Sequence, residues 1–483
     1  MELQWNKRPC AYIKTQFRQV QPQEQTQELR LTEEMPDIGR VLCAWGQPVV
    51  RSKEWRMDAV MVTGGVNASV AYMPEDGSGI KVMETWIPFQ SKWNLQQTSR
   101  EGTIRVKCLL RELDARLISA RKLMLRANVA VFAEGLESSE VDVFSPDELP
   151  VGVEVLTNIY PAMIPKEAGE KQFFIEEELH VPDASQWISF TAAPEITEHN
   201  LVGSRIVIRG VAKLHYVYLN DAGEINSGNQ PIPFAQFIDL DGDYDKETLA
   251  DILLILSTLE HELAPDGVKV QCGIAAQYLV WNRELLEIAE DAYSNQCAVS
   301  IQQETVALPM QLDERTETVN FDSEPPRGNV LDVVFRPDFP ISYREGDCVH
   351  IEIPGNFQYL FLDSDANLQS MVQNAVATLD YPANTGCQLV PYILETDFDE
   401  QSARMAVGVQ THVNQELSMI SGLAMGEIYP TDQVKPTLIL RRMNTDSLWQ
   451  LAKESGSTMD AIRKANQLTS DPVEGEMLLI PVN

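Results

Sequence analysis

Residues 210–234 read GVAKLHYVYLNDAGEINSGNQPIPF, a run in which apolar and polar side chains alternate before a turn. Successive side chains of a strand point to opposite faces, so the apolar residues share one face of an extended chain. These residues are Ala212, Leu214, Tyr216 and Tyr218. The turn at Asn220-Asp221-Ala222-Gly223 and the following Ile232-Pro233-Phe234 predict a second strand, which returns antiparallel to the first.

The same pattern occurs earlier in the chain, starting at Gly65. Its alternating residues are Val66, Ala68, Val70 and Tyr72, followed by a turn at Pro74-Glu75-Asp76-Gly77 and then by Ile87-Pro88-Phe89. The spacing from Gly65 to Pro88 equals that from Gly210 to Pro233, 23 residues in each copy. Equal spacing predicts a duplicated domain in which the two Ile-Pro-Phe elements occupy equivalent positions.

A third, degenerate copy follows, without the Ile-Pro-Phe element. Its alternating residues are Ile351, Ile353, Phe357, Tyr359 and Phe361, and its turn lies at Asp363-Ser364-Asp365. Each copy also has a downstream stretch centred on an arginine, at Ser119-Ala120-Arg121, Trp281-Asn282-Arg283 and Ser402-Ala403-Arg404. Each repeat is longer than about 100 residues, well above the roughly 20–50 residues of solenoid repeats, so we expect each copy to have its own core. The fold class is therefore mainly β and multidomain, with tandem antiparallel, sandwich-like repeats.

One segment of the second copy is expected to be helical, from about Lys246 to Glu262. Asp245 is placed to cap its N-terminus. Its apolar stripe consists of Leu249, Ile252, Leu253, Leu256 and Leu259. This spacing predicts a helix that packs on its own domain.

Composition restricts the partners and the compartment. Lys and Arg number 38 against 71 Asp and Glu, and the formal charge of -33 disfavours nucleic acid and anionic lipid. The N-terminal sequence has no apolar signal, and the run from Leu249 to Leu263 is broken by polar residues, so we expect neither export nor a membrane span. Seven scattered cysteines without a C-x-x-C pair are typical of free thiols in a reducing cytoplasm.

Catalytic and metal motifs are incomplete in this sequence. His261-Glu262 starts like a zinc-protease helix, but Pro265 stands where the second histidine is needed. The acidic run at Asp239, Asp241, Asp243 and Asp245 lacks the glycine and the bidentate glutamate of a calcium loop. P-loop and G-x-S-x-G patterns are absent from the sequence. We therefore expect no enzyme, and we assign no catalytic residue, no cofactor and no metal ligand.

The last 47 residues, 437–483, follow a different pattern. It predicts a strand at 438–440, helices at 447–455 and 458–466, and a strand at 478–481. Asp446 or Ser447 is expected to cap the first helix, and Thr458 the second. Leu448 and Ile462 are expected to be core residues of this unit.

This α+β (βααβ) unit resembles a LysM domain. The resemblance lies in Asp446–Lys453, Met459–Ile462, Asn466–Leu468 and Gly475–Pro481. It implies a shallow groove for N-acetylglucosamine glycans, formed by Asn444, Thr445, Asp446, Ser447, Leu448, Asn466, Gln467 and Leu468. Thr445 replaces the family's glycine, and a side chain there hinders the approach of a sugar to the main chain, so we expect this unit to recognise a protein.

The chain as a whole resembles SipL-like clostridial spore coat morphogenetic proteins, whose repeats are called SPOCS or DUF3794 domains. On this basis the chain divides into an N-terminal segment (1–24), repeat 1 (25–150), repeat 2 (151–296), degenerate repeat 3 (297–436) and the LysM domain (437–483). The resemblance implies the mother-cell cytoplasm during sporulation, recruitment to the forespore surface, and a coat-basement morphogenetic ATPase as LysM partner. Two alternatives remain: a peptidoglycan-binding envelope protein, and a hydrolase with a LysM anchor.

Overall fold

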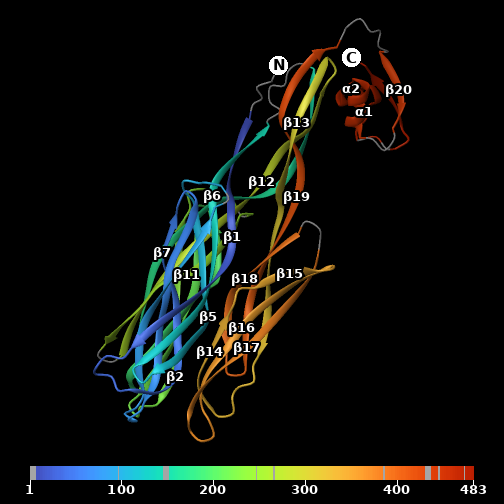
Figure 1. Cartoon of the computed structure of the whole chain (residues 1–483). Coiled ribbons are helices and arrows are strands. Elements are labelled where there is room, and N and C mark those ends of the chain that lie inside the picture. Colours follow the sequence, from blue (N-terminus) through green and yellow to red (C-terminus); the bar gives the residue numbers. More distant parts are fainter. Residues whose placement is uncertain are drawn as a thin grey trace.

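A computed structural model describes residues 7–95, 97–144, 152–245, 247–264, 267–383, 387–429, 437–443, 447–470, 472 and 474–482. Strands β1 to β19 build three elongated β units, and β20, α1, α2 and β21 form a small C-terminal domain (Figure 1). The small domain lies at the far end of the molecule, beyond the long strands β12, β13 and β19. The expected mainly β fold with a small α+β domain is confirmed.

The strands of each unit follow one another along the chain. Unit 1 contains β1 (Lys7–Arg30), β2 (Ile38–Trp55), β3 (Ala59–Pro74), β4 (Lys81–Asn94), β5 (Thr103–Ser119) and β6 (Lys122–Phe144). Unit 2 contains β7 (Val153–Leu179), β8 (Ala184–Val202), β9 (Arg205–Asn220), β10 (Ile225–Asp239), β11 (Leu249–Ala264) and β12 (Gly267–Ser294). Unit 3 contains β13 (Cys297–Asp322), β14 (Asn329–Pro337), β15 (Ile341–Glu345), β16 (Cys348–Leu362), β17 (Leu368–Pro382), β18 (Cys387–Phe398) and β19 (Ser402–Ile428).

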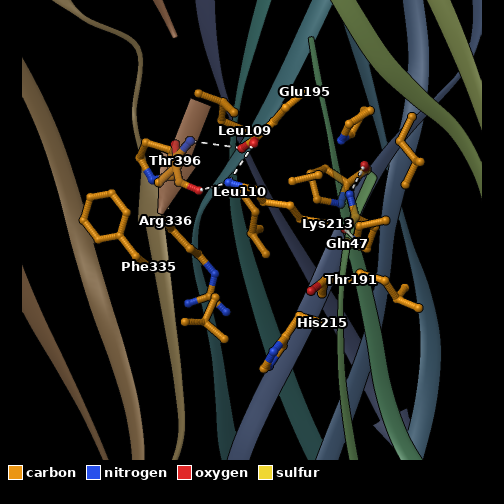
Figure 2. A pocket seen from close by; sticks show the side chains of 18 of the residues that line it. Gln47, Leu109, Leu110, Thr191, Glu195, Lys213, His215, Phe335, Arg336 and Thr396 are labelled. Carbon is orange, nitrogen blue, oxygen red and sulfur yellow. Dashed lines mark hydrogen bonds and ion pairs between the residues drawn. The ribbon is translucent and has the colours of Figure 1, made fainter. Parts of the chain in front are cut away.

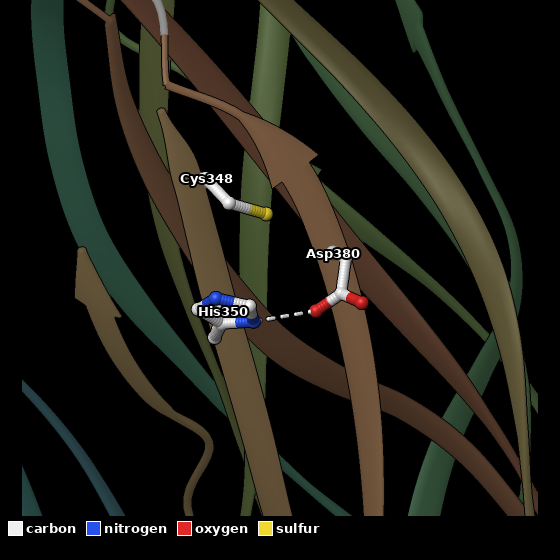
Figure 3. Close-up of side chains that lie close together, drawn as sticks. All are labelled: Cys348, His350 and Asp380. Carbon is white, nitrogen blue, oxygen red and sulfur yellow. Dashed lines mark hydrogen bonds and ion pairs between the residues drawn. The ribbon is translucent and has the colours of Figure 1, made fainter. Parts of the chain in front are cut away.

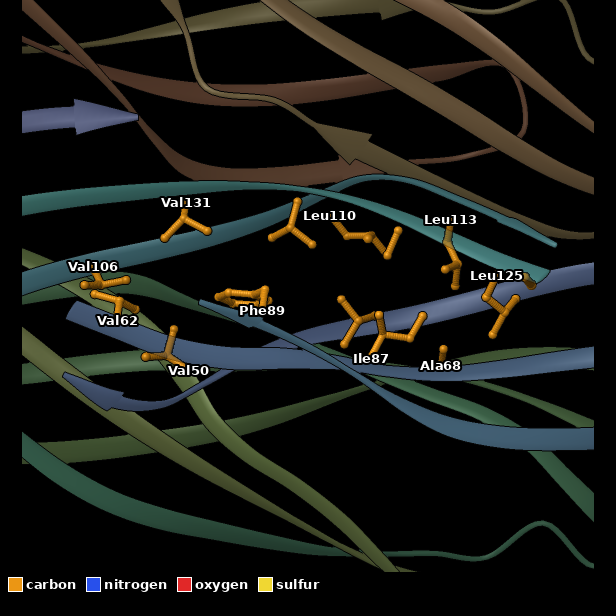
Figure 4. Close-up of a cluster of buried hydrophobic side chains, with 14 of the residues drawn as sticks. Val50, Val62, Ala68, Ile87, Phe89, Val106, Leu110, Leu113, Leu125 and Val131 are labelled. Carbon is orange, nitrogen blue, oxygen red and sulfur yellow. The ribbon is translucent and has the colours of Figure 1, made fainter. Parts of the chain in front are cut away.

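The three units share one topology of two antiparallel sheets. In each unit the last strand lies between the first strand and the one before the last, giving the orders β1-β6-β5, β11-β12-β7 and β13-β19-β18. The intervening strands form the second sheet, β2-β3-β4, β10-β9-β8 and, in unit 3, β14 and β15 with β16 and β17. Figure 4 shows the two sheets of unit 1 enclosing the core, with Ile87 and Phe89 from one sheet and Val106 and Val131 from the other.

A glycine under an aromatic ring recurs at the centre of each second sheet. A Cβ atom on Gly64 would lie 2.7 Å from the ring of Phe89, and one on Gly210 would lie 2.4 Å from the ring of Phe234. In unit 3, Gly355 pairs on β17 with Ala375, which has no ring. The ring comes instead from Phe335 of β14 and lies 2.6 Å from the position of a Cβ atom on Gly355. The third copy therefore needs no Ile-Pro-Phe element, because its phenylalanine comes from another strand.

The Ile-Pro-Phe elements of units 1 and 2 occupy equivalent positions, as predicted. The glycine was misassigned by one residue: Gly64 pairs with Phe89 as Gly210 pairs with Phe234, so Gly64 and not Gly65 is the counterpart of Gly210. The segment from Gly64 to Phe89 is therefore one residue longer than the segment from Gly210 to Phe234, and the longer turn between β3 and β4 accommodates this residue. Counting from Gly65 made the two spacings equal and so concealed the difference.

The predicted helix from Lys246 to Glu262 is wrong. Leu249–Ala264 is strand β11, and it pairs with β12 along its whole length. Leu254 and Leu256 pack in the core of unit 2, whereas Ile255 packs in the core of unit 1. A strand covered on both faces has a continuous apolar run, which periodicity alone does not distinguish from a helix.

Two further expectations need correction. Strand β1 runs from Lys7 to Arg30 beside β6, so the expected boundary between residues 24 and 25 falls inside a strand of unit 1. The arginine stretches are not equivalent: Arg121 precedes β6 and Arg404 lies at the start of β19, but Arg283 lies well inside β12. The boundary between 296 and 297 falls between β12 and β13.

The units also share a core, so the expectation of separate cores holds only in part. A buried cluster at their junction combines Trp45 of unit 1, Val217 of unit 2 and Leu360 of unit 3. Polar groups also pair across units. The indole of Trp45 in unit 1 donates to Asp332 in unit 3 at 2.8 Å, and the side chain of Gln277 in unit 2 bonds both the N–H and the C=O of Val106 in unit 1 at 2.8 Å. Buried polar groups paired across units require the units to dock in one arrangement.

Candidate functional site

The C-terminal domain has the predicted strand-helix-helix-strand order. It consists of β20 (Leu438–Arg442), α1 (Leu448–Ser455), α2 (Met459–Asn466) and β21 (Met477–Pro481). The hydroxyl of Ser447 caps α1 by accepting from the N–H of Gln450 at 3.2 Å, and that of Thr458 caps α2 by accepting from Ala461 at 3.1 Å. Leu448 is 5% exposed and Ile462 is fully buried, which confirms both as core residues.

Three of the five expected groove residues that the structure describes have structural roles. Asn444, Thr445 and Asp446 lie outside the described residues. The amide of Asn466 donates to the carbonyls of Ile462 and Leu479 and accepts from the N–H of Leu479, so it fixes the end of α2 to β21. Leu448 is buried, and Leu468 packs against the same core.

Ser447 and Gln467 are the expected groove residues that are exposed in the described part of the chain. Gln467 ends α2 in the left-handed conformation, with a φ of 54°. Residues other than glycine adopt this conformation infrequently, and here the backbone N–H of Gln467 bonds back to the helix. The side chain of Gln467 is thus held at the surface where α2 ends.

The outer face of the small sheet carries an apolar patch that the sequence interpretation missed. Its members are large and exposed: Leu438 (53%), Leu440 (61%), Met477 (52%) and Leu479 (38%). Leu440 pairs directly with Leu479, so their side chains lie side by side on one face. The signal was present in the sequence as two apolar runs, LIL at 438–440 and MLLI at 477–480, in which residues of both faces are apolar.

The LysM-like domain docks on unit 2 through Asp291 and Tyr293. The carboxylate of Asp291 accepts from the indole N–H of Trp449 at 2.7 Å and from the ammonium of Lys453 at 2.7 and 2.8 Å. The hydroxyl of Tyr293 donates to the carbonyl of Ser457 at 2.8 Å, and its ring packs edge-on against that of Trp449. Burial raises the pKa of Tyr293, so the tyrosine keeps the proton that it donates.

A β-bulge presents Asp291 to the small domain. The register of β12 against β7 shifts between Ala289 and Asp291, so the strand gains one residue and bends at this point. Leu156 of β7 packs beside the same contact. A bulge redirects a side chain that regular alternation would place elsewhere, and here it directs a carboxylate toward α1.

A cavity of about 470 Å³ lies where the three units meet (Figure 2). Glu195 and Lys213 of unit 2 form an ion pair of 2.9 Å, and both bond the backbone of Thr396 in unit 3. Burial raises the pKa of Glu195 despite the neighbouring Lys213 ammonium. These charged groups connect strands of units 2 and 3.

The motifs rejected from the sequence have ordinary roles in the structure. Asp239 pairs with Arg205 at 2.6 Å, and Asp245 accepts from the backbone of Glu247 at 2.8 Å, so both of these carboxylates have partners within the chain. The ring of His261 packs against Phe190. Burial raises the pKa of the Cys43 thiol to about 12, which keeps it protonated and unreactive.

The described geometry is that of a protein with tandem β-sandwich units and a docked βααβ binding module. Two family models match stretches of this chain, one within unit 2 and one in the C-terminal domain. The family model of the SipL, SPOCS domain matches residues 183–252, which cover β8 to β10 and the start of β11. The LysM domain model matches residues 444–481. The resemblance to SipL-like proteins with SPOCS and C-terminal LysM domains is thereby confirmed.

The two matched domains are non-catalytic binding domains, and together they support a spore-associated protein that contains a LysM domain. No curated protein and no solved structure matches the chain significantly. Among the described residues, no helix is long and apolar enough to cross a membrane.

Proposed function

We propose that this chain is a non-catalytic adaptor of spore coat assembly, which binds a coat-basement morphogenetic ATPase through its LysM domain. It acts in the mother-cell cytoplasm and is recruited to the forespore surface. The SPOCS and LysM matches support the sporulation context. The partner and the compartment follow from the resemblance to SipL-like proteins.

The observation that best supports a protein partner is the apolar patch of β20 and β21. Leu438, Leu440, Met477 and Leu479 are exposed although they are large and adjacent. Exposed clusters of this kind mark protein-binding surfaces, where a few buried side chains account for most of the affinity. The patch lies on a domain held in place by Asp291, so it is presented in a defined orientation.

The direct test measures binding of the purified full-length chain to the purified ATPase by biolayer interferometry. Leu440→Ser should weaken binding at least tenfold, because a central apolar contact contributes about 2 kcal/mol or more. Leu285→Ser is the matched control, since Leu285 is 70% exposed on β12, away from the patch. Equal affinity for wild type and Leu440→Ser would contradict the assigned surface.

The groove loops offer a second protein-binding surface, and substitution tests them separately. Replacing Asp446 and Gln467 should weaken partner binding without unfolding the domain if these loops take part. Asp446 precedes the cap of α1, so the melting temperature of the variant must be compared with that of the wild type.

A second candidate function is the binding of peptidoglycan glycans, which the LysM match favours. The role of Asn466 disfavours glycan binding, because its side-chain amide already bonds the main chain of β21. Titration of the chain with chitin or peptidoglycan oligomers separates the two functions. Saturable binding tighter than about 1 mM would establish the glycan function.

A further inference from the structure

Three metal-binding residue types meet on the outer face of unit 3, on strands β16 and β17 (Figure 3). Cys348 and His350 are two residues apart on β16 and so point to the same face. Asp380 of β17 pairs directly with His350. The ligand atoms of the three side chains all lie within 4.8 Å of one another.

The neighbouring strand places a second carboxylate on the other side of the imidazole. Glu345 at the end of β15 pairs with Cys348, and its Oε2 lies 4.0 Å from Nε2 of His350. On the other side, Nδ1 of His350 lies 2.7 Å from Oδ1 of Asp380. The imidazole thus lies between two carboxylates, with the thiol beside it.

We propose that Cys348, His350 and Asp380 bind a divalent transition metal of the Zn²⁺ class. A thiolate and an imidazole favour Zn²⁺ over Ca²⁺ and Mg²⁺, which prefer oxygen ligands. Donor atoms lie about 2.0–2.3 Å from bound zinc, so two donors on one ion are about 3–4 Å apart. Closing from 4.8 Å to this distance requires only small rotations of side chains that are partly exposed.

The environment of Cys348 differs from that of the interior cysteines. Burial raises the pKa of the Cys43, Cys108 and Cys272 thiols, which disfavours the thiolate that a metal needs. Cys348 is only partly buried and lies next to an imidazole.

A bound ion would connect strands β16 and β17 at one end of this sheet. Cys348 begins β16 immediately after the β15–β16 turn, and Asp380 lies near the end of β17. The carbonyl of Asp347 in that turn already accepts from the N–H of Ala383 at 2.8 Å. A metal binding only the folded state would stabilise this end of unit 3 further.

Titration of the metal-free, reduced full-length chain with Co²⁺ tests the site. A thiolate ligand to Co²⁺ gives a charge-transfer absorption band in the near ultraviolet, and we expect this band to saturate at one equivalent. Competition with Zn²⁺ should remove the band, because Zn²⁺ binds thiolate sites more tightly than Co²⁺. A titration without this band overturns the proposal.

Variants locate the ion. Cys348→Ser should abolish the band, and His350→Ala should weaken Co²⁺ binding at least tenfold. Cys10→Ser, which alters another partly buried cysteine, should leave both unchanged. Circular dichroism verifies that each variant is folded, as expected for substitutions at a partly exposed position. A band of full intensity in Cys348→Ser would place the metal elsewhere and overturn the assignment.

Discussion

Oδ2 of Asp291 on β12 lies 2.7 Å from the indole nitrogen of Trp449 on α1, across the boundary between a SPOCS-like unit and the LysM domain. The LysM domain is therefore attached to the β units by a specific polar contact as well as by the chain. The contact occupies the α1 side of the LysM domain and leaves the outer face of β20 and β21 exposed. A partner bound to that face would be held in a defined orientation relative to unit 2.

Removing the carboxylate should release the LysM domain. Asp291→Ala removes the acceptor of both Trp449 and Lys453, and a charge-assisted hydrogen bond of this kind contributes about 1.5–3 kcal/mol. We expect faster amide hydrogen exchange in α1 without a change in the cores of the units. Glu287→Ala, at an exposed carboxylate of the same strand, is the control. Exchange in α1 that is equal in Asp291→Ala and the control would show that the contact does not hold the domain.

The LysM core should be sensitive to truncation. Leu448→Ala and Ile462→Ala remove buried side chains and should each destabilise the domain by about 2–5 kcal/mol. Leu479→Ala removes a side chain that is 38% exposed and should have a much smaller effect. Urea unfolding followed by hydrogen exchange in α1 and α2 measures the difference. A loss for Leu479→Ala as large as that for Ile462→Ala would contradict the assigned core.

Local patterns in the sequence predicted the LysM domain and the repeats, because both depend on neighbouring residues. Ser447 and Thr458 cap their helices as expected, since a cap bonds within three residues of itself. Alternation found the central strand of each second sheet. The segment at Leu249–Ala264 was misread, because packing against two units makes both of its faces apolar.

Other features depend on residues that only the fold brings together. Asp291 and Trp449 are far apart in sequence, and a β-bulge is needed to direct the carboxylate toward α1. Cys348 and Asp380 meet through the register of two strands, so no spacing motif identifies them. The sequence interpretation therefore assigned no metal ligand. The LysM groove was expected to bind a partner, whereas Asn466 in it bonds the main chain of β21.

Replacing the glycine beneath the aromatic ring by alanine should have different consequences in units 1 and 3. A Cβ on Gly355 would contact mainly the ring of Phe335, so Gly355→Ala should destabilise unit 3 by about 1–3 kcal/mol, and Phe335→Leu should recover part of this loss. A Cβ on Gly64 would also lie 2.3 Å from the carbonyl oxygen of Val49. Phe89→Leu should therefore not rescue Gly64→Ala. Double-mutant cycles from urea unfolding provide the test, and rescue in both units would refute the distinction.

The contact between His215 and Asp332 at the junction of units 2 and 3 should make stability depend on pH. Nε2 of His215 lies 3.0 Å from Oδ1 of Asp332, and both side chains are buried. Burial alone would lower the pKa of His215, but the Asp332 carboxylate and the hydrogen bond with Asn229 together more than offset this, so the pKa is raised. The Asp332 pKa is held below its usual range by His215 and Trp45, against the opposing effect of burial.

A raised folded-state pKa means that the stabilisation from His215 is fully present below the unfolded pKa of about 6.5 and is lost as the pH rises through the folded value. Asp332 acts in a different window, because its depressed pKa affects stability only in acid. Burial lowers the pKa values of His199 and His412, so protonation of these two histidines disfavours the folded state. Near pH 6 their contribution to stability therefore falls as the pH falls, opposite to that of His215. Wild type must therefore be compared with His215→Gln at each pH. We expect a difference in unfolding free energy of about 1–3 kcal/mol near pH 5.5 that shrinks toward pH 8.5. A difference that stays constant or grows over this range would show that His215 does not gain a proton on folding.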